Sequence, residues 1–222
     1  MNYNPKPAKP LSRSVGRVAI ALLAVAAMAP AFADRGDAAF LSAREAFRNG
    51  ERVRLGRQVD LLKGHPLQPW AEYWVQRLKL DDGDDSGVAE YLARYPNAYL
   101  AEKLRADWLR VLGKKADWTS FQRELPALAV PDAEVSCYAA QATGMAAAVR
   151  PLWNSGQDLP QACEALVDQM VAAGNLTVEE VWQRVRRLFE AKRAGAARSA
   201  AAYLPASEGF DGRGLESIAQ SP

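Results

Sequence analysis

The sequence predicts an all-α protein in which short antiparallel helices stack into a right-handed α-superhelix, or solenoid. Apolar residues recur at helical spacing through most of the chain, and no stretch alternates with period two for long enough to form a strand. Turn-forming and capping residues separate the periodic segments, so each helix is short. A short helix cannot bury its apolar stripe alone, and stacking against its neighbours is the arrangement that covers it.

The first 33 residues have the pattern of a secretory signal peptide. Basic residues precede an apolar run over 18–28, and Ala31-Phe32-Ala33 places small residues where signal peptidase reads. The run is too short to span ~30 Å of hydrocarbon, and no cysteine follows it to carry a lipid anchor. We expect cleavage after Ala33 and a periplasmic chain without a membrane anchor; the alternative is an uncleaved amino-terminal helix.

Residues 34–205 are expected to form the superhelical domain. Trp70, Tyr73, Trp74, Arg77 and Leu78 share one helical face. Three later segments also place apolar residues on one helical face. These residues are Val88, Tyr91, Leu92 and Tyr95; Leu104, Trp108, Val111 and Leu112; and Val181, Val185, Leu188 and Phe189. Segment spacings near the ~34 residues of a tetratricopeptide unit indicate degenerate repeats, since the signature of that unit does not recur in register. Residues 206–222 show no period, and we expect them to be a disordered tail.

Helix ends are marked by residues with specific backbone or capping roles. Thr177 and Glu180 form a capping box, and Asn97 is predicted to cap the helix that follows the stop at Pro96. Several glycines follow periodic runs, where a residue that adopts the left-handed conformation ends a helix. These glycines are Gly50, Gly64, Gly83, Gly113, Gly174 and Gly195.

Charge argues against a nucleic-acid partner. The full chain has 28 Lys and Arg against 26 Asp and Glu. The signal segment holds four of the basic residues and no acidic one, which leaves 24 against 26 and a net charge of −2. A nearly neutral chain lacks the electrostatic footprint of a nucleic-acid binder. One local basic cluster is expected to be a solvated helix face. Its members are Arg184, Arg186, Arg187, Lys192 and Arg193.

The two cysteines, Cys137 and Cys163, support the predicted compartment. An even number of cysteines in an exported chain indicates a disulfide. The closed loop of about 25 residues would contribute roughly 3.5 kcal/mol through chain entropy. Two buried free thiols are the alternative. A zinc site is not expected, because two cysteines and one distant histidine lack the paired ligand spacing that zinc requires.

No residue set has the pattern of a catalytic, cofactor or metal site. His65 is the only histidine, and it lies in a His-Pro turn where packing beside Trp70 accounts for it. Glycine-rich phosphate loops and zinc-helix motifs are absent from the sequence. An acidic cluster around Gly83 does not fit the twelve-residue calcium loop, so we expect a solvated turn. Its members are Asp81, Asp82, Asp84 and Asp85.

The helix-turn-helix run over residues 65–126, which contains HPLQPWAEYWVQRLKL and VAEYLARYPNAYLAEKLRADWL, resembles the amino-terminal superhelical domain of the soluble lytic murein transglycosylases. The likeness continues through CYAAQATG, RPLWNSGQDLPQACEALV and GNLTVEEVWQRVRRLFEA. In that family the active site lies in a separate lysozyme-like domain near the carboxyl end. The resemblance implies that this chain is the helical domain only, with peptidoglycan strands or a lysozyme-like catalytic domain as partner.

The pair Glu216-Ser217 matches the catalytic dipeptide of that family but lies in the predicted tail. A general acid must be a desolvated glutamate with a raised pKa, and a tail cannot desolvate Glu216. We therefore expect no catalytic residue in this chain and a structural, substrate-positioning role in murein turnover. The alternative is a stand-alone periplasmic helical-repeat adaptor that binds proteins in a concave groove.

Overall fold

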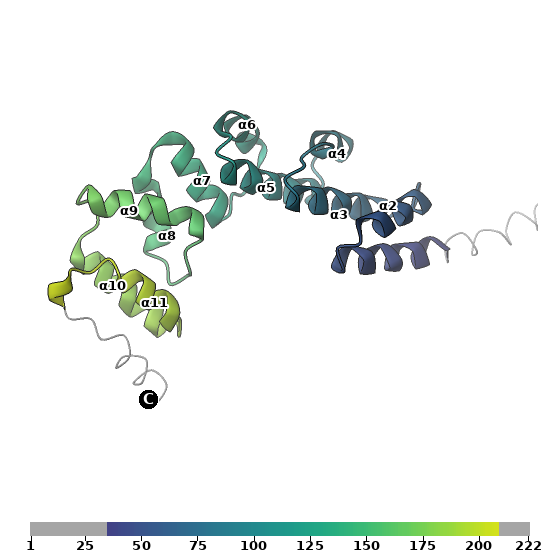
Figure 1. The fold of residues 1–222 in the computed structure, drawn as a ribbon. Coiled ribbons are helices and arrows are strands. Elements are labelled where there is room, and N and C mark those ends of the chain that lie inside the picture. The colour runs from purple at the N-terminus through teal and green to yellow at the C-terminus, as the bar shows by residue number, and fades with distance from the viewer. Residues whose placement is uncertain (1–34, 209–222) are drawn as a thin grey trace, which may run out of the picture. The chain divides into compact units, whose positions relative to one another are not determined.

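The computed structural model describes residues 35–208, and these residues are all-helical, without a strand (Figure 1). The chain divides into two compact units, Met1–Leu78 and Lys79–Pro222. The predicted signal peptide and the tail beyond Glu208 lie outside the described residues.

The first unit is built around an aromatic cluster. Its described part contains a helical segment over residues 35–48, helix α2 (Arg52–Leu61) and most of α3 (Gln68–Asp81). The buried indole of Trp74 stacks on Phe40 and Phe47, with ring centroids 5.2 and 5.5 Å apart. Trp70, on the same predicted stripe, is 38% exposed, whereas Ala71 and Leu80, which lie outside that stripe, are buried. The buried face of α3 is therefore shifted from the predicted one.

The second unit begins with helices that pack around α5. Its first elements are α4 (Val88–Arg94), α5 (Tyr99–Lys114), α6 (Trp118–Glu124), the 3-10 turn η1 (Leu125–Ala127) and α7 (Ala133–Thr143). Helix α5 contacts α4, α6 and α7. Its predicted apolar face is confirmed at Leu104, Trp108 and Leu112, which are all buried. The side chains of α4 that face it are buried as well, because both helices contribute their apolar stripes to one core.

The rest of the second unit alternates 3-10 turns with short helices. Its elements are η2 (Ala146–Val149), α8 (Arg150–Trp153), η3 (Gln161–Cys163), α9 (Glu164–Ala172), α10 (Val178–Glu190), α11 (Ala194–Ala201) and η4 (Ala206–Glu208). Helices α10 and α11 pack side by side, and α9 packs on η2 and α7. Residues 206–208 form η4, and Trp182 Nε1 donates a hydrogen bond of 2.9 Å to Glu208 Oε2.

The predicted helix ends are correct at some positions and wrong at others. The capping box is confirmed: Thr177 Oγ1 accepts from the Glu180 amide, and the Glu180 carboxylate accepts from the Thr177 amide. Asn97 is not a cap, because Ala98 occupies the cap position of α5 and Asn97 has φ 62° in the preceding turn. Gly113 and Gly195 lie inside α5 and α11 instead of ending a helix.

Gly113 has a packing role that the sequence did not indicate. A Cβ added at this position would lie 2.3 Å from Tyr138 Cγ, so the ring of Tyr138 rests directly on the backbone of α5. Glycine is therefore what permits the close approach of α5 and α7.

Cys137 and Cys163 are joined by a disulfide, with their Cα atoms 5.1 Å apart. Cys137 lies in α7 and Cys163 ends η3, and both side chains are buried. The disulfide thus links α7 covalently to the turn that leads into α9.

Candidate functional site

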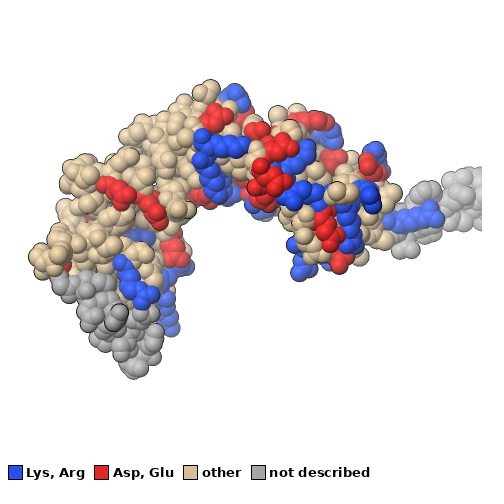
Figure 2. All heavy atoms as spheres, viewed as in Figure 1, with Lys and Arg blue, Asp and Glu red and all other residues tan. Residues whose placement is uncertain are grey.

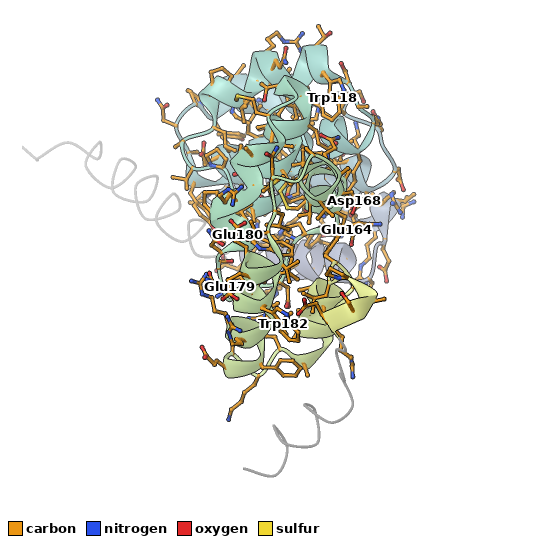
Figure 3. All side chains as sticks on the ribbon, turned by 90° about the vertical axis from the view of Figure 1, so that its left-hand side faces the viewer. Trp118, Glu164, Asp168, Glu179, Glu180 and Trp182 are labelled. Carbon is orange, nitrogen blue, oxygen red and sulfur yellow. A yellow bond between two sulfur atoms is a disulfide. The ribbon has the colours of Figure 1, made fainter. Side chains whose placement is uncertain are left out.

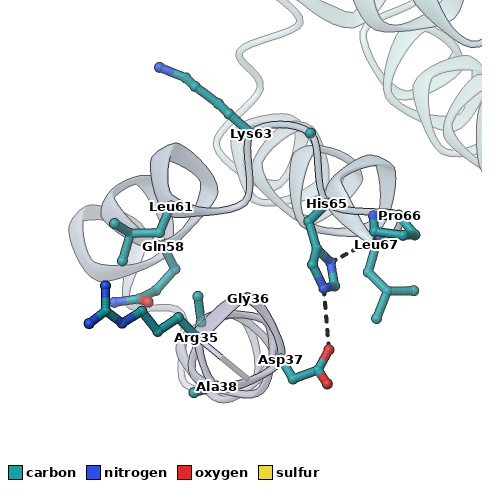
Figure 4. Close-up of a pocket in the computed structure, with 12 residues that line it drawn as sticks. Arg35, Gly36, Asp37, Ala38, Gln58, Leu61, Lys63, His65, Pro66 and Leu67 are labelled. Carbon is teal, nitrogen blue, oxygen red and sulfur yellow. Dashed lines mark hydrogen bonds and ion pairs between the residues drawn. The ribbon is translucent and has the colours of Figure 1, made fainter. Parts of the chain in front are cut away.

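The first unit contains a pocket of about 1020 Å³ (Figure 4). One side is formed by residues 35–39 of the first helical segment, and the other by the end of α2 and the turn into α3. Arg35 and Lys63 bring positive charge to its edge, and Leu61 gives it an apolar wall. His65, the only histidine of the chain, also lines this pocket. The pocket is therefore the first candidate for a catalytic site.

Both ring nitrogens of His65 are already engaged. Nδ1 accepts a hydrogen bond of 3.2 Å from the Leu67 amide, so Nε2 carries the proton of the neutral ring. Nε2 lies 3.2 Å from Asp37 Oδ1 and donates to it (Figure 4). A general base needs a free lone pair, and this ring offers none without breaking a bond that holds the turn.

The His65 ring packs on the first helical segment. A Cβ added at Gly36 would lie 2.5 Å from His65 Cδ2, so the ring rests on the backbone at Gly36. His65 thus fastens the α2–α3 turn to residues 36 and 37, which is a structural role.

A second cavity, of about 750 Å³, lies in the second unit at the start of α5. The turn over residues 96–98, the first turns of α5 and the segment after η1 surround it. It is lined by an exposed aromatic ring, Tyr99, and by the polar side chains of Asn97, Glu102 and Arg105. These groups can bind a polar ligand, but they include no nucleophile paired with a base.

Arg184 corrects the expectation of a solvated basic face. Its side chain is only 3% exposed, and it donates to the carbonyl oxygens of Trp153, Ser155 and Gln157. The guanidinium carbon lies 4.9 Å from the centroid of the Trp153 ring, a cation–π contact. Burial lowers the pKa of Arg184.

Two other members of the predicted cluster bind the same loop, which follows α8. Arg187 donates to the Asn154 carbonyl at 2.7 Å, and Arg193 pairs with Asp158 at 2.6 Å. Arg184, Arg187 and Arg193 therefore bind the loop over 153–158, whereas Arg186 is exposed and pairs with Glu179. The available signal was the register of Arg184, which shares the apolar stripe of Val181, Val185 and Leu188.

Acidic side chains lie near the carboxyl end of the described chain. Figure 3 shows Glu164 and Asp168 close together on α9, with Glu179, Glu180 and Trp182 on α10. Asp168 accepts a hydrogen bond of 2.9 Å from the Tyr203 hydroxyl. Burial and this bond raise the pKa of Tyr203 to about 12. The phenol is therefore a donor at neutral pH and cannot act as a base.

Four carboxyl groups have lowered pKa values, the opposite of what a general acid requires. A hydrogen bond from Arg54 lowers the pKa of Glu51, and bonds from Ser86 and Ser120 lower those of Asp84 and Asp117. The Thr177 amide lowers the pKa of Glu180. Each carboxylate is held ionised by a cap or an ion pair, whereas glycosidic cleavage needs a protonated acid at neutral pH.

The acidic turn around Gly83 is occupied by structural contacts. Asp84 accepts from the Ser86 amide, and Asp85 accepts from Trp108 Nε1 at 2.9 Å. Within residues 35–208, no group of three or more His, Cys, Asp or Glu side chains is placed to hold a metal ion. Glu216, the catalytic match that the sequence suggested, lies outside the described residues.

The surface in view carries both signs of charge. Figure 2 shows Lys and Arg beside Asp and Glu over each unit, with acidic side chains over α9 in the second. None of the helices in the described part of the chain is both long enough and apolar enough to cross a bilayer.

These elements define an all-helical class of protein. The chain is similar to soluble lytic murein transglycosylases. It is 24% identical over 189 residues to that of Salmonella typhimurium, with 81% of this chain and 29% of the relative covered. It is 24% identical over 214 residues to that of Escherichia coli K12, with 91% and 33% covered. The predicted resemblance is thereby confirmed, and the chain spans about a third of the length of these relatives.

Solved structures give the same result for the fold. The 70-kDa soluble lytic transglycosylase of Escherichia coli matches with a TM-score of 0.60 and 23% identity, over 84% of this chain and 31% of the enzyme. A complex of the 70-kDa soluble lytic transglycosylase with bulgecin A has a TM-score of 0.59 and 22% identity, over 85% and 32%. An inactive mutant of lytic transglycosylase Slt from Pseudomonas aeruginosa has a TM-score of 0.59 and 26% identity, over 83% and 31%. No protein-family model matches the chain.

Proposed function

We propose that this chain is the helical superhelix domain of a lytic transglycosylase-like protein and that it acts in peptidoglycan turnover. Its role is to position murein strands, or a lysozyme-like catalytic domain, and it does not itself cut glycan. The observation that carries this proposal is the sequence similarity to soluble lytic murein transglycosylases over 81% to 91% of the chain.

The chemistry of the described residues supports a positioning role over a catalytic one. His65 has both ring nitrogens engaged, and Glu180 is held ionised by the helix cap that it completes. Neither group can donate a proton to a glycosidic oxygen at neutral pH without losing a structural bond. The cavities of the two units offer polar and aromatic groups for recognition instead.

The proposal places the mature chain in the periplasm, after export and cleavage between Ala33 and Asp34. The sequence pattern of residues 1–33 and the disulfide between Cys137 and Cys163 support it, because disulfides persist in oxidising compartments. Intact-mass analysis of periplasmic protein is expected to show a chain that begins at Asp34. Protein that retains Met1 in a cytosolic pool would contradict this placement.

Co-sedimentation with protein-free sacculi tests the binding role. We expect the full chain to enter the pellet with intact sacculi and to return to the supernatant when soluble glycan fragments compete. A heat-unfolded sample of the same chain is the control for non-specific trapping. A folded chain that stays in the supernatant at every sacculus concentration would contradict the proposal and favour the protein-binding adaptor.

A further inference from the structure

The cavity at the start of α5 differs from the His65 pocket because its polar groups retain unused bonding capacity. We define the α5 groove by the residues that line it between the 96–98 turn and the segment after η1. Its volume of about 750 Å³ lies in the ~300–1,000 Å³ range of ligand pockets. All of its lining residues lie within the described second unit.

Two charged side chains of the α5 groove are held in place by the protein itself. Glu102 Oε1 accepts a hydrogen bond of 2.6 Å from the Ala129 amide. Arg105 Nη1 donates to Glu124 Oε2 at 2.7 Å, and both side chains of this pair are mostly buried. Each bond uses one end of its group, which leaves Glu102 Oε2 and Arg105 Nη2 for a ligand. Because the side chains are already ordered, binding costs little additional rotamer entropy.

The rim of the α5 groove carries two side chains that bind nothing within the described protein. Tyr99 is 72% exposed, and its ring and hydroxyl have no partner among the described residues. The Asn97 carboxamide likewise makes no hydrogen bond within the described residues. Asn97 lies in the turn that forms the rim. Its φ of 62° is in the left-handed region, which asparagine tolerates. A free aromatic face thus stands beside a free amide donor and acceptor.

We propose that the α5 groove binds an N-acetylated sugar of a glycan strand. The face of Tyr99 packs on the C–H face of a pyranose ring, while Asn97 and Arg105 bind the acetamido group and Glu102 Oε2 accepts from a ring hydroxyl. The charges of the groove favour this neutral ligand over a nucleic acid. Arg105 is already paired with Glu124, so it offers no unpaired positive charge to a phosphate. The proposal rests on the proposed function, of which it names one binding surface.

Amide NMR titration of the full chain with tetra-N-acetylchitotetraose tests the groove. We expect shifts at residues 97–105 and 127–129, and smaller shifts with cellotetraose, which lacks acetamido groups.

Tyr99→Ala is expected to raise the Kd about tenfold, whereas Tyr99→Phe retains the ring and most of the affinity. Asn97→Gly suits the left-handed backbone, and loss of its hydrogen bonds should raise the Kd roughly three- to tenfold. Met145→Ala removes an exposed side chain of the same unit outside the groove and is the matched control.

The outcomes separate this inference from the proposed function. No shift in the groove with the acetylated sugar, or shifts only with free stem peptides, would overturn the glycan assignment. If the wild type and Tyr99→Ala bind sacculi equally, the groove is overturned and the proposed function stands. Sugar binding in the groove by a chain that does not sediment with sacculi would support the groove and contradict the proposed function. Unchanged amide spectra outside the groove establish that each variant is folded.

Discussion

Arg184 shows how one buried charge can organise a loop without a carboxylate in contact. Its guanidinium donates to the carbonyl groups of Trp153, Ser155 and Gln157. We expect Arg184→Met to keep the apolar stem but to lower the free energy of unfolding by about 2 to 4 kcal/mol, because the carbonyls lose their donors. Arg186→Met is the control, since its exposed pair with Glu179 is worth about 1 kcal/mol or less.

Urea unfolding of both variants measures the difference. Equal losses in the two variants would show that the buried contacts of Arg184 do not stabilise the loop.

Ionisation of Tyr203 makes the free energy of unfolding depend on pH in the alkaline range. Its pKa is raised from 10.0 to about 12 in the folded state, so the phenol is protonated in both states below pH 10. Above that pH the unfolded chain loses the proton first, and the stabilisation disappears as pH rises through about 12.

Wild type is therefore expected to lose stability between pH 10 and 12 more steeply than Tyr203→Phe. Urea midpoints across this range, with tyrosinate absorbance to follow ionisation, measure both effects. Parallel pH profiles for the two proteins would contradict the assignment.

At the scale of helix packing, Gly113 is the contact on which α5 and α7 depend. Gly113→Ala would place a methyl group against the Tyr138 ring, and we expect a loss of about 1 to 3 kcal/mol from overpacking. Gly56→Ala in α2 is the matched control, because nothing lies within 4 Å of its added Cβ. Helix propensity should make that change stabilising by about 0.5 to 1 kcal/mol. Thermal unfolding of the two variants should therefore shift in opposite directions.

The disulfide provides a second test of element packing. The double variant Cys137→Ala/Cys163→Ala lacks the disulfide, so the loop between positions separated by 26 residues is no longer closed. We expect the variant to remain helical but to lose roughly 3.5 kcal/mol of stability, since its unfolded chain has more freedom. Each single variant should lose a similar amount. Alkylation of the folded wild-type protein without reductant should label neither cysteine, and full labelling would show that the thiols are free.

The helices could be predicted from the sequence because periodicity and burial agree along them. The stripe of α5 and the capping box of α10 depend on neighbours within one helix, and both are confirmed. Asn97 and Gly113 were misassigned because their roles depend on partners or backbone angles that local spacing does not encode. The buried face of α3 was misplaced for a similar reason: Trp70 is exposed whereas Ala71 and Leu80 are buried, because periodicity identifies an apolar face but not which part of it a neighbour covers.

At the scale of the whole molecule, the sequence predicted the kind of protein better than its binding surfaces. The family resemblance follows from residues spread over most of the chain, and it is confirmed by relatives that are 24% identical. The α5 groove could not be predicted, because Tyr99 and Arg105 meet residues near Ala129 only through the packing of α5 on its neighbours. The sequence does not indicate which of the exposed aromatic residues in helical segments line a groove.

In its proposed role, this chain positions glycan without cutting it. The most direct test is mass spectrometry of the muropeptides released when the purified full chain is incubated with sacculi. We expect no anhydromuropeptides above the level of a sample without protein. Anhydromuropeptides that disappear with Glu216→Gln would contradict it and place a catalytic acid in that segment; product unaffected by that change would contradict it through a different residue.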